Sequence, residues 1–318
     1  MANNGYVVGI GAANVDIFGK SKNNLIPEDS NPGYISVSVG GVTHNMCTNA
    51  SKLGLDVYLI TTVGDDGYGK MITEDCQQNG IHTDHFFTLP GNVSSTYISL
   101  HNNNGEMALA VSDMHILQKL TPEMLATKDE LLKNAKMIVM DTGLPEVILD
   151  FVLDTYGETV PVFIDTVSTT YGKKVIGRLG KIHTLKPNEL EAEMLTGVKI
   201  TDRESLKLAA QRMLDEGLQR VIISRGGDGI CYADKNGTMF TAKAEKLENI
   251  ANATGAGDSM AGGLMYSLIN GLSPEETAKF AMSCSMLTIC HEATIHPQMS
   301  AALVNSEKET HKFEIEAL

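Results

Sequence analysis

Short apolar runs recur along the chain, separated by stretches long enough to form helices. They lie at residues 6–10, 57–63, 136–140, 160–164, 183–185 and 221–224. Strands buried on both faces of a parallel sheet have this continuous apolar character, and a crossover connects each to the next. The pattern predicts an α/β fold with a central, mostly parallel sheet flanked by helices. No repeat or long linker divides residues 1–318, so we expect a single domain.

Three polar segments predict where helices begin. TDRE from Thr201 and SPEE from Ser273 match the capping box, in which an N-cap side chain and a Glu three residues later bond each other's backbone. Thr121 followed by Pro122 predicts a helix with proline in its first turn.

Two segments interrupt the α/β alternation. Residues 17–39 carry turn signals followed by the alternating apolar residues Ile35, Val37 and Val39, and residues 94–111 resemble a hairpin with NNNG as its turn. Such strands have no thick core of their own, so we expect a small β-strand lid that covers a site. Because exposed strand edges invite pairing, we also expect a homodimer through the lid strands.

The stretch NATGAGDSMAGG, residues 252–263, combines small residues with an acid before a helical pattern. Backbone N–H groups at a helix N-terminus bind anions, and the small Gly255, Ala256 and Gly257 leave them open. Asp258 beside this anion hole could accept a proton from an attacking hydroxyl. The alternative is a close-packed helix start that Asp258 merely caps.

Two further loops follow predicted strands. In KPNELE, Asn188 and Glu191 are three residues apart and share a helix face, which suits Mg²⁺ held through water, although an N-cap with a first-turn Glu is the commoner meaning. In SRGGDG, Ser224, Gly226 and Gly229 could let a nucleotide approach the backbone. A plain hairpin turn is an equal alternative there.

The N-terminal stretch GIGAAN resembles part of a dinucleotide-binding fingerprint but departs from it at Asn14, where the chain continues as a strand, so we exclude an NAD site. Asn14 and Asp16 lie two apart and face the same way on a strand. Together they suit a diol such as that of ribose, with Gly41 and Asn45 adding small and polar groups. Alternatively, Asp16 only ends a strand.

Charge and cysteine use narrow the class of partner. The net charge of −14 disfavours nucleic acid and anionic membrane surfaces, and no apolar run is long enough to span a bilayer. The five cysteines are scattered without a CxxC pair, which is typical of a reduced, cytoplasmic protein.

Jointly and in this order, the stretches resemble the ribokinase-like (phosphofructokinase-B) family of carbohydrate and nucleoside kinases. GGVTHNMCTNASKLG with VGDDGYG is similar to the family's first signature, and NATGAGDSMAGG to its second. KPNELE matches its N-x-x-E motif, and SRGGDG its nucleotide loop. The resemblance covers nearly the whole chain and implies a parallel sheet flanked by helices, a small β lid and transfer of the ATP γ-phosphoryl to a hydroxyl.

Residue roles follow from the resemblance, position by position. It implies Asp258 as general base and as a substrate contact, with Gly255, Ala256 and Gly257 as the anion hole. It further implies the following contacts: Asn14, Asp16, Gly41 and Asn45 to the sugar hydroxyls; Asn188, Ser224, Gly226, Gly229 and Gly257 to ATP; Asn188 and Glu191 to Mg²⁺.

Two departures concern a monovalent cation such as potassium (K+), which the resemblance implies beside the anion hole. The second signature of the family usually begins Asp-Thr, but here Asn252 and Ala253 stand there. The segment HEATIHP lacks the glycine that the family often has. Both departures weaken the case for potassium activation without excluding it.

Within the family, the sequence is most similar to kinases of the C-nucleoside pseudouridine. The stretches DSNPG, NGEMALAVSDMHI and IHTLKPNELEAE and the unusual Asn252 carry this similarity. It implies a nucleoside phosphorylated at its 5′-hydroxyl, with lid residues Ser95, Tyr97, Asp113 and Met114 as candidates to face the base. A ribokinase or another sugar or nucleoside kinase fits the same motifs. An inactive nucleoside-binding protein is the alternative outside enzymes.

Overall fold

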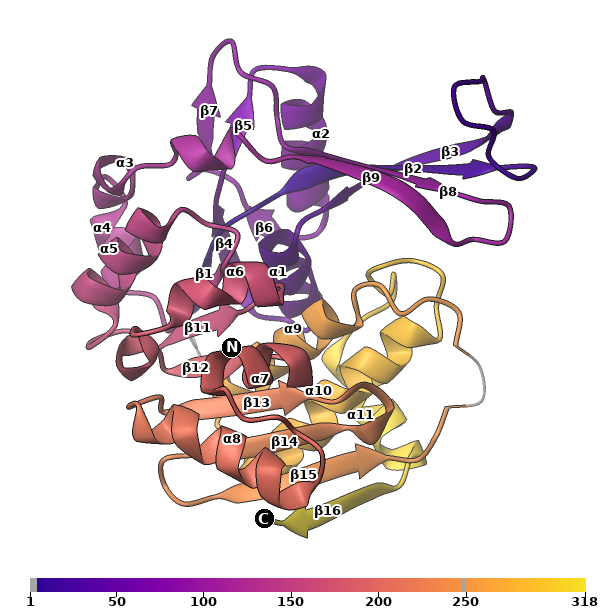
Figure 1. Cartoon of the computed structure of the whole chain (residues 1–318). Helices are drawn as coiled ribbons and strands as arrows, with labels where there is room; N and C mark the ends of the chain where they lie inside the picture. Colours follow the sequence, from indigo (N-terminus) through magenta and orange to yellow (C-terminus); the bar gives the residue numbers. More distant parts are fainter. Residues whose placement is uncertain (1–4, 248–249) are drawn as a thin grey trace.

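A single large sheet forms the centre of this protein, whose computed structural model describes residues 5–247 and 250–318 (Figure 1). Its strands are β1 (Tyr6–Ile10), β4 (Asp56–Ile60), β6 (Ile81–His82), β10 (Met137–Asp141), β11 (Val162–Asp165), β12 (Thr184–Lys186), β13 (Arg220–Ser224), β14 (Ile230–Asp234), β15 (Met239–Ala244) and β16 (Phe313–Ala317). They are ordered β16-β15-β14-β13-β12-β11-β10-β1-β4-β6.

Parallel pairing runs from β6 through to β13, and only β14, β15 and β16 continue the sheet antiparallel. The predicted mostly parallel sheet is therefore confirmed. The expected strand at 57–63 is divided. The chain leaves the large sheet after Ile60, and β5 (Thr62–Gly64) pairs instead with β7 (Phe87–Leu89).

Helices cover both faces of the sheet. They are α1 (Val42–Lys52), α2 (Gly67–Gln78), α3 (Pro122–Ala126), α4 (Asp129–Lys133), α5 (Glu146–Tyr156), α6 (Thr169–Gly172), α7 (Glu189–Thr196), α8 (Arg203–Asp215), α9 (Ala256–Ile269), α10 (Pro274–Ile289) and α11 (Ala301–Thr310). No helix in residues 5–247 or 250–318 is long and apolar enough to cross a membrane.

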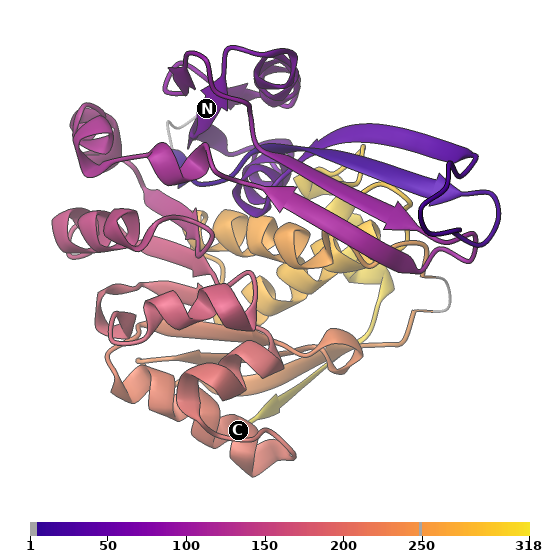
Figure 2. The ribbon, with the colours of Figure 1, turned by 45° about the horizontal axis from the view of Figure 1, so that its top comes forward.

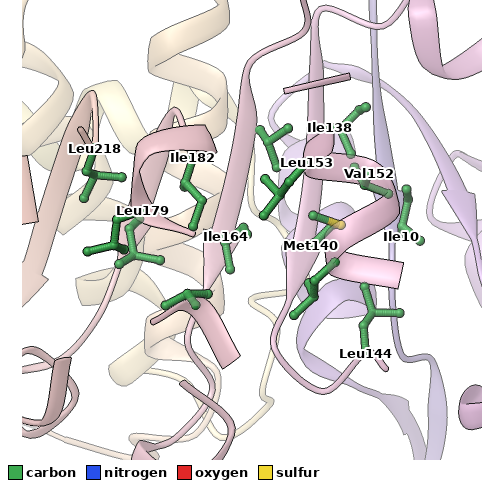
Figure 3. Close-up of a cluster of buried hydrophobic side chains, with 14 of the residues drawn as sticks. Ile10, Ile138, Met140, Leu144, Val152, Leu153, Ile164, Leu179, Ile182 and Leu218 are labelled. Atoms are coloured by element: carbon green, nitrogen blue, oxygen red, sulfur yellow. The ribbon is translucent and has the colours of Figure 1, made fainter. Parts of the chain in front are cut away.

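Two hydrophobic cores lie on opposite faces of the sheet because successive strand side chains point to opposite sides. Val8 and Ile10 of β1 pack with residues of α5 and α8, whereas Val7 packs with residues of α1, α9 and α10. Figure 3 shows part of the first core, where Met140 of β10 and Val152 of α5 are both completely buried. The two cores fix the sheet and thereby position its carboxyl edge.

A second, four-stranded sheet projects from the main body (Figure 2). Its strands are β2 (Asn14–Ser21), β3 (Gly33–Gly40), β8 (Thr96–His101) and β9 (Met107–Asp113), in the order β3-β2-β8-β9. The antiparallel strands expected from the sequence are therefore present. The first pair spans 14–40 rather than 17–39, and the second spans 96–113 rather than 94–111. They join through a parallel pairing of β2 with β8, which local patterning does not reveal.

Two of the three expected helix starts are confirmed, and one is displaced. Thr121 caps α3 and Ser273 caps α10, each followed by proline in the first turn. Ser273 supplies its half of the predicted capping box, whereas the Glu276 carboxylate pairs with Lys279 and Lys308. For α8 the N-cap is Asp202 rather than Thr201. The Asp202 carboxylate accepts from the backbone N–H of Ser205, whose hydroxyl accepts in return from the Asp202 N–H, so the capping box is one residue later than predicted.

Candidate active site

The first turns of α1 and α9 meet above the carboxyl edge of the parallel sheet. The two helices pack so closely that any side chain at position 262 of α9 would collide with Asn49 of α1. Gly262 therefore permits the contact. On these first turns, Asn45 Nδ2 donates to Asp258 Oδ2 at 2.8 Å. A predicted substrate contact and the predicted base are therefore in direct contact.

The N-terminus of α9 combines both interpretations of the GAG stretch. Gly255 is the N-cap in a left-handed conformation (φ 81°), and a side chain there would collide with the carbonyl of Thr294, so close packing requires this glycine. Gly257 is exposed in the first turn, where N–H groups lack helical partners. The Ala256 N–H makes a long 3.4 Å hydrogen bond to Ala253 O, so the N–H of Gly257 is the more open donor.

The surroundings of Asp258 hold its pKa near neutrality. Burial is the main cause that raises the pKa, to about 7, and the nearby carboxylate of Asp165 raises it further. The hydrogen bond from Asn45 and the positive charge of Lys186 act in the opposite direction. A carboxylate with such a pKa can both accept and release a proton near pH 7.

A buried charged group beneath α9 was missed by the sequence analysis. Lys186, at the end of β12, donates from Nζ to Asp165 Oδ2 at 2.8 Å, and both side chains are less than a tenth exposed. Lys186 Nζ lies close to Gly257. Asp141 ends the neighbouring β10 and accepts a 2.5 Å hydrogen bond from the hydroxyl of Thr43. A signal for these residues was present in the sequence, because three successive apolar runs each end in a charged residue. Ligands of open α/β sheets bind at the carboxyl ends of such strands.

The proposed sugar contacts lie on β2 and at the start of α1. Asn14 Nδ2 donates to Asp16 Oδ1 at 2.5 Å, which agrees with the expectation that the two side chains share a face. Burial raises the pKa of Asp16, although the bond from Asn14 and the charge of His44 oppose this rise. Gly41, the N-cap of α1, lies against Asn14 Oδ1. The alternative that Asp16 ends a strand is wrong, because β2 continues to Ser21.

Asn188 and Glu191 form a complete capping box at the start of α7. The Asn188 side chain accepts from the Glu191 N–H, and Glu191 accepts from the backbone and side-chain N–H groups of Asn188. Glu191 Oε2 also accepts from the Thr166 hydroxyl at 2.6 Å. With these oxygens already engaged, the pair suits a hydrated Mg²⁺ contacted through water rather than a directly ligated ion.

The SRGGDG loop lies beside this capping box rather than beside Asp258. The Ser224 N–H donates to Pro187 O at 2.9 Å, and Arg225 pairs with Glu189. The loop joins β13 to the antiparallel β14, so it is also a hairpin turn. Gly226 leaves open space, whereas a side chain at Gly229 would collide with the backbone of β15. Packing alone therefore explains the glycine at position 229.

Comparison with known proteins decides the family. The model of the pfkB family of carbohydrate kinases matches residues 4–301. The chain belongs to this family. It is 41% identical to pseudouridine kinase of Escherichia coli over 95% of this chain and 96% of that protein, and 33% identical to an uncharacterised sugar kinase of the same organism over 93% of this chain and 81% of that protein.

Structural similarity agrees with the family assignment. A ribokinase of Arabidopsis thaliana, solved with ribose and ATP, superposes with a TM-score of 0.85 at 21% identity, covering 96% of this chain and 99% of that one. The fold is therefore that of the ribokinases. As a pfkB family member, the chain is a phosphotransferase that acts on an alcohol group, in the class of sugar and nucleoside kinases.

Proposed function

We propose that this pfkB family kinase transfers the γ-phosphoryl of ATP to the 5′-hydroxyl of pseudouridine, giving pseudouridine 5′-phosphate. The observation that carries the chemistry is the contact of Asp258 with Asn45 beside the open N-terminus of α9. The similarity to pseudouridine kinase, 41% over nearly the whole of both chains, carries the substrate.

Asp258 is the proposed general base. With a pKa of about 7, it is substantially ionised at neutral pH and can take the proton of the attacking hydroxyl. The N–H groups of Gly255, Ala256 and Gly257 lie at the positive end of the α9 dipole, where charge on the transferring phosphoryl is favoured. Catalysis then consists mainly of positioning and charge stabilisation.

The nucleoside and ATP occupy separate parts of this arrangement. Asn14, Asp16, Gly41 and Asn45 would hold the ribose hydroxyls, and Ser224, Gly226, Gly229 and Asn188 would lie along ATP. A Mg²⁺ ion bound with ATP neutralises phosphate charge. Asn188 and Glu191 would orient its water shell, and their mutual hydrogen bonds hold both side chains in place for this.

The lid offers one face to the proposed nucleoside. Tyr97 pairs with Asp16 in the lid sheet and therefore shares its face, so Tyr97 is the better candidate for a base contact. Asp113 pairs with Thr96, the residue before Tyr97, so its side chain points to the opposite face of the lid sheet. Its carboxylate also accepts from the backbone N–H of His115. Ser95 is buried at the base of the lid, and Met114 follows β9. Among these four residues, Tyr97 therefore carries the proposal.

The other face of the lid sheet supports a homodimer. By strand register, six partly or largely exposed apolar residues share this face: Ile35, Val37, Ile98, Leu100, Leu109 and Val111. An apolar sheet face of this kind is normally covered. A second copy presents the same face, so isologous pairing of lids would bury both.

The role of potassium is limited by the side chain of Asn252. Its Nδ2 donates to Glu292 O at 3.0 Å, and its Oδ1 accepts from the Thr254 N–H at 2.9 Å. An amide N–H thus holds a loop carbonyl that a cation could otherwise bind. We propose that this contact replaces the cation and that potassium has little effect.

Identification of the product tests the function. The enzyme with ATP, Mg²⁺ and pseudouridine should yield a phosphate monoester at the 5′ position by ³¹P NMR. Phosphorylation of ribose instead would favour the ribokinase alternative. Binding of nucleosides without turnover would favour an inactive nucleoside-binding protein. ATP supply and the scattered cysteines, which form no CxxC pair, support a cytoplasmic location.

A further inference from the structure

A chain of hydrogen bonds leads from Asp258 away from the proposed substrate site to the surface of α2. Asn45 Nδ2 donates to Asp258, and Asn45 Oδ1 lies 3.1 Å from Nδ1 of His44. The other ring nitrogen, Nε2, lies 2.9 Å from Asp75 Oδ2. The His44 side chain is 1% exposed and that of Asp75 is 34% exposed, so this series of hydrogen bonds runs from the interior to solvent.

Both ring nitrogens of His44 face acceptor oxygens. A neutral imidazole has one N–H and could satisfy only one of them, whereas the doubly protonated ring donates to both. The hydroxyl of Thr48 is the other polar group near Nε2, at 3.5 Å. The charged groups around the ring are Asp75 from α2 and Asp16 from β2, with Asp258 of α9 behind Asn45. All three of these groups are acids.

The orientation of the Asn45 amide connects the two ends of the chain. While its NH₂ group faces an acceptor oxygen of Asp258, its own oxygen faces His44, and this arrangement needs an N–H on Nδ1 of the ring. If Nδ1 carried no proton, the Asn45 amide would fit better when reversed. Its NH₂ group would then face His44, and its oxygen would face Asp258. That reversed contact favours a protonated Asp258, which cannot act as a base.

We propose that His44, supported by Asp75, is a positioning residue that holds the Asn45 amide with its NH₂ toward Asp258 and so keeps the base ionised. The inference rests on the proposed function of Asp258 as general base. Neither His44 nor Asp75 has a role among the predicted site residues, and neither touches the proposed reacting atoms. Asn79 Nδ2 donates to the Asp75 side chain at 3.2 Å and holds this carboxylate in place.

Asp75→Asn is the decisive variant because it keeps an acceptor oxygen within reach of His44 Nε2 and removes the negative charge, at the cost of turning one oxygen into an NH₂ group. Glu74→Gln is the matched control, since Glu74 is the neighbouring carboxylate on α2, more than half exposed and paired with Lys70. The measurement is kcat/KM for the nucleoside against pH at saturating ATP. We expect the acid limb of Asp75→Asn to move up by about one pH unit, which is about a tenfold loss at pH 6, with the plateau at pH 9 kept within about twofold.

The outcomes separate this inference from a general structural defect. A loss of activity that is equal at every pH, or a profile that matches that of Glu74→Gln, would overturn the inference while leaving the kinase function intact. The protonation of His44 can also be read without turnover. In full-length protein labelled with ¹⁵N-histidine, the His44 ring should carry a proton on Nδ1, which faces the Asn45 oxygen, and Asp75→Asn should change the same signal.

The NMR result stands even if no nucleoside or sugar is phosphorylated, in which case the proposed function fails separately. The loss of a signal in His44→Gln would assign that signal to the His44 ring. If His44→Gln does not fold because position 44 is buried, the signal that responds to Asp75→Asn gives the assignment instead. A His44 ring without a proton on Nδ1 would overturn the inference.

Discussion

The side-chain amide of Asn45 donates a 2.8 Å hydrogen bond to the carboxylate of Asp258, although 213 residues separate them in the chain. The contact joins the first turns of α1 and α9, each of which begins beside a glycine N-cap. It therefore places a polar group from the N-terminal half beside the helix N-terminus where phosphate is expected to bind. We expect the ionisation of Asp258, and with it the activity, to depend on this contact.

Asp258→Asn should abolish turnover and yet stabilise the fold at alkaline pH. Because the folded protein raises the pKa of Asp258 to about 7, ionisation costs stability as pH rises from about 4 through 7. Asn carries no charge, so the variant should gain about 1 to 2 kcal/mol in unfolding free energy at pH 8 and little at pH 5. Urea unfolding at the two pH values measures this. An equal change at both would show that the charge of Asp258 is not the cause.

Lys186→Met should destabilise the fold and impair the base. Removal of the lysine leaves Asp165 buried without its partner, which we expect to cost about 3 kcal/mol in unfolding free energy. It should also raise the pKa of Asp258, so that activity needs a higher pH. Lys199→Met is the control because Lys199 makes an ion pair with Glu193 while largely exposed. Comparable losses in both variants would argue against a special role for the buried pair.

Charges on the apolar face of the lid should separate the proposed dimer. The double variant Leu109→Lys, Val111→Lys places like charges where two lids would meet, so sedimentation velocity should show monomers. The control is Leu208→Lys, a similarly exposed leucine on α8. Monomeric wild-type protein at micromolar concentration would contradict the dimer directly.

Exchange of potassium for sodium should leave activity nearly unchanged, within about twofold, because the Asn252 amide already holds the Glu292 carbonyl. Asn252→Asp removes this donor and adds a negative charge, and the variant should become more sensitive to potassium. Initial rates in matched chloride buffers test both statements. Strong potassium activation of the wild type would show that the amide does not replace the ion.

The sequence predicted the features that are local in the chain. The parallel sheet followed from continuous apolar runs, and the helix start at Ala256 followed from small residues before a helical pattern. The capping role of Asn188 was one of two open alternatives, and the commoner one, because an Asn followed three residues later by Glu fits both a cap and a metal ligand. Spacing alone could not choose between them.

Contacts between distant segments were not predictable in this way. Lys186 and Asp165 each end a strand, but only the sheet order places β11 beside β12 and so pairs their charges. His44 lies inside a recognised motif, and its partner Asp75 lies on another helix, 31 residues away. The shared face of Tyr97 and Asp16 depends on the parallel pairing of β2 with β8.

The most direct test of the central claim is ATP-dependent phosphorylation across pseudouridine, uridine, adenosine, inosine, ribose and fructose, with Asp258→Asn assayed beside the wild type. We expect strong turnover of pseudouridine and a loss of at least about a thousandfold in the variant. Turnover of ribose or another nucleoside in preference to pseudouridine would contradict the proposed substrate. An Asp258→Asn enzyme as active as the wild type would contradict the proposed base.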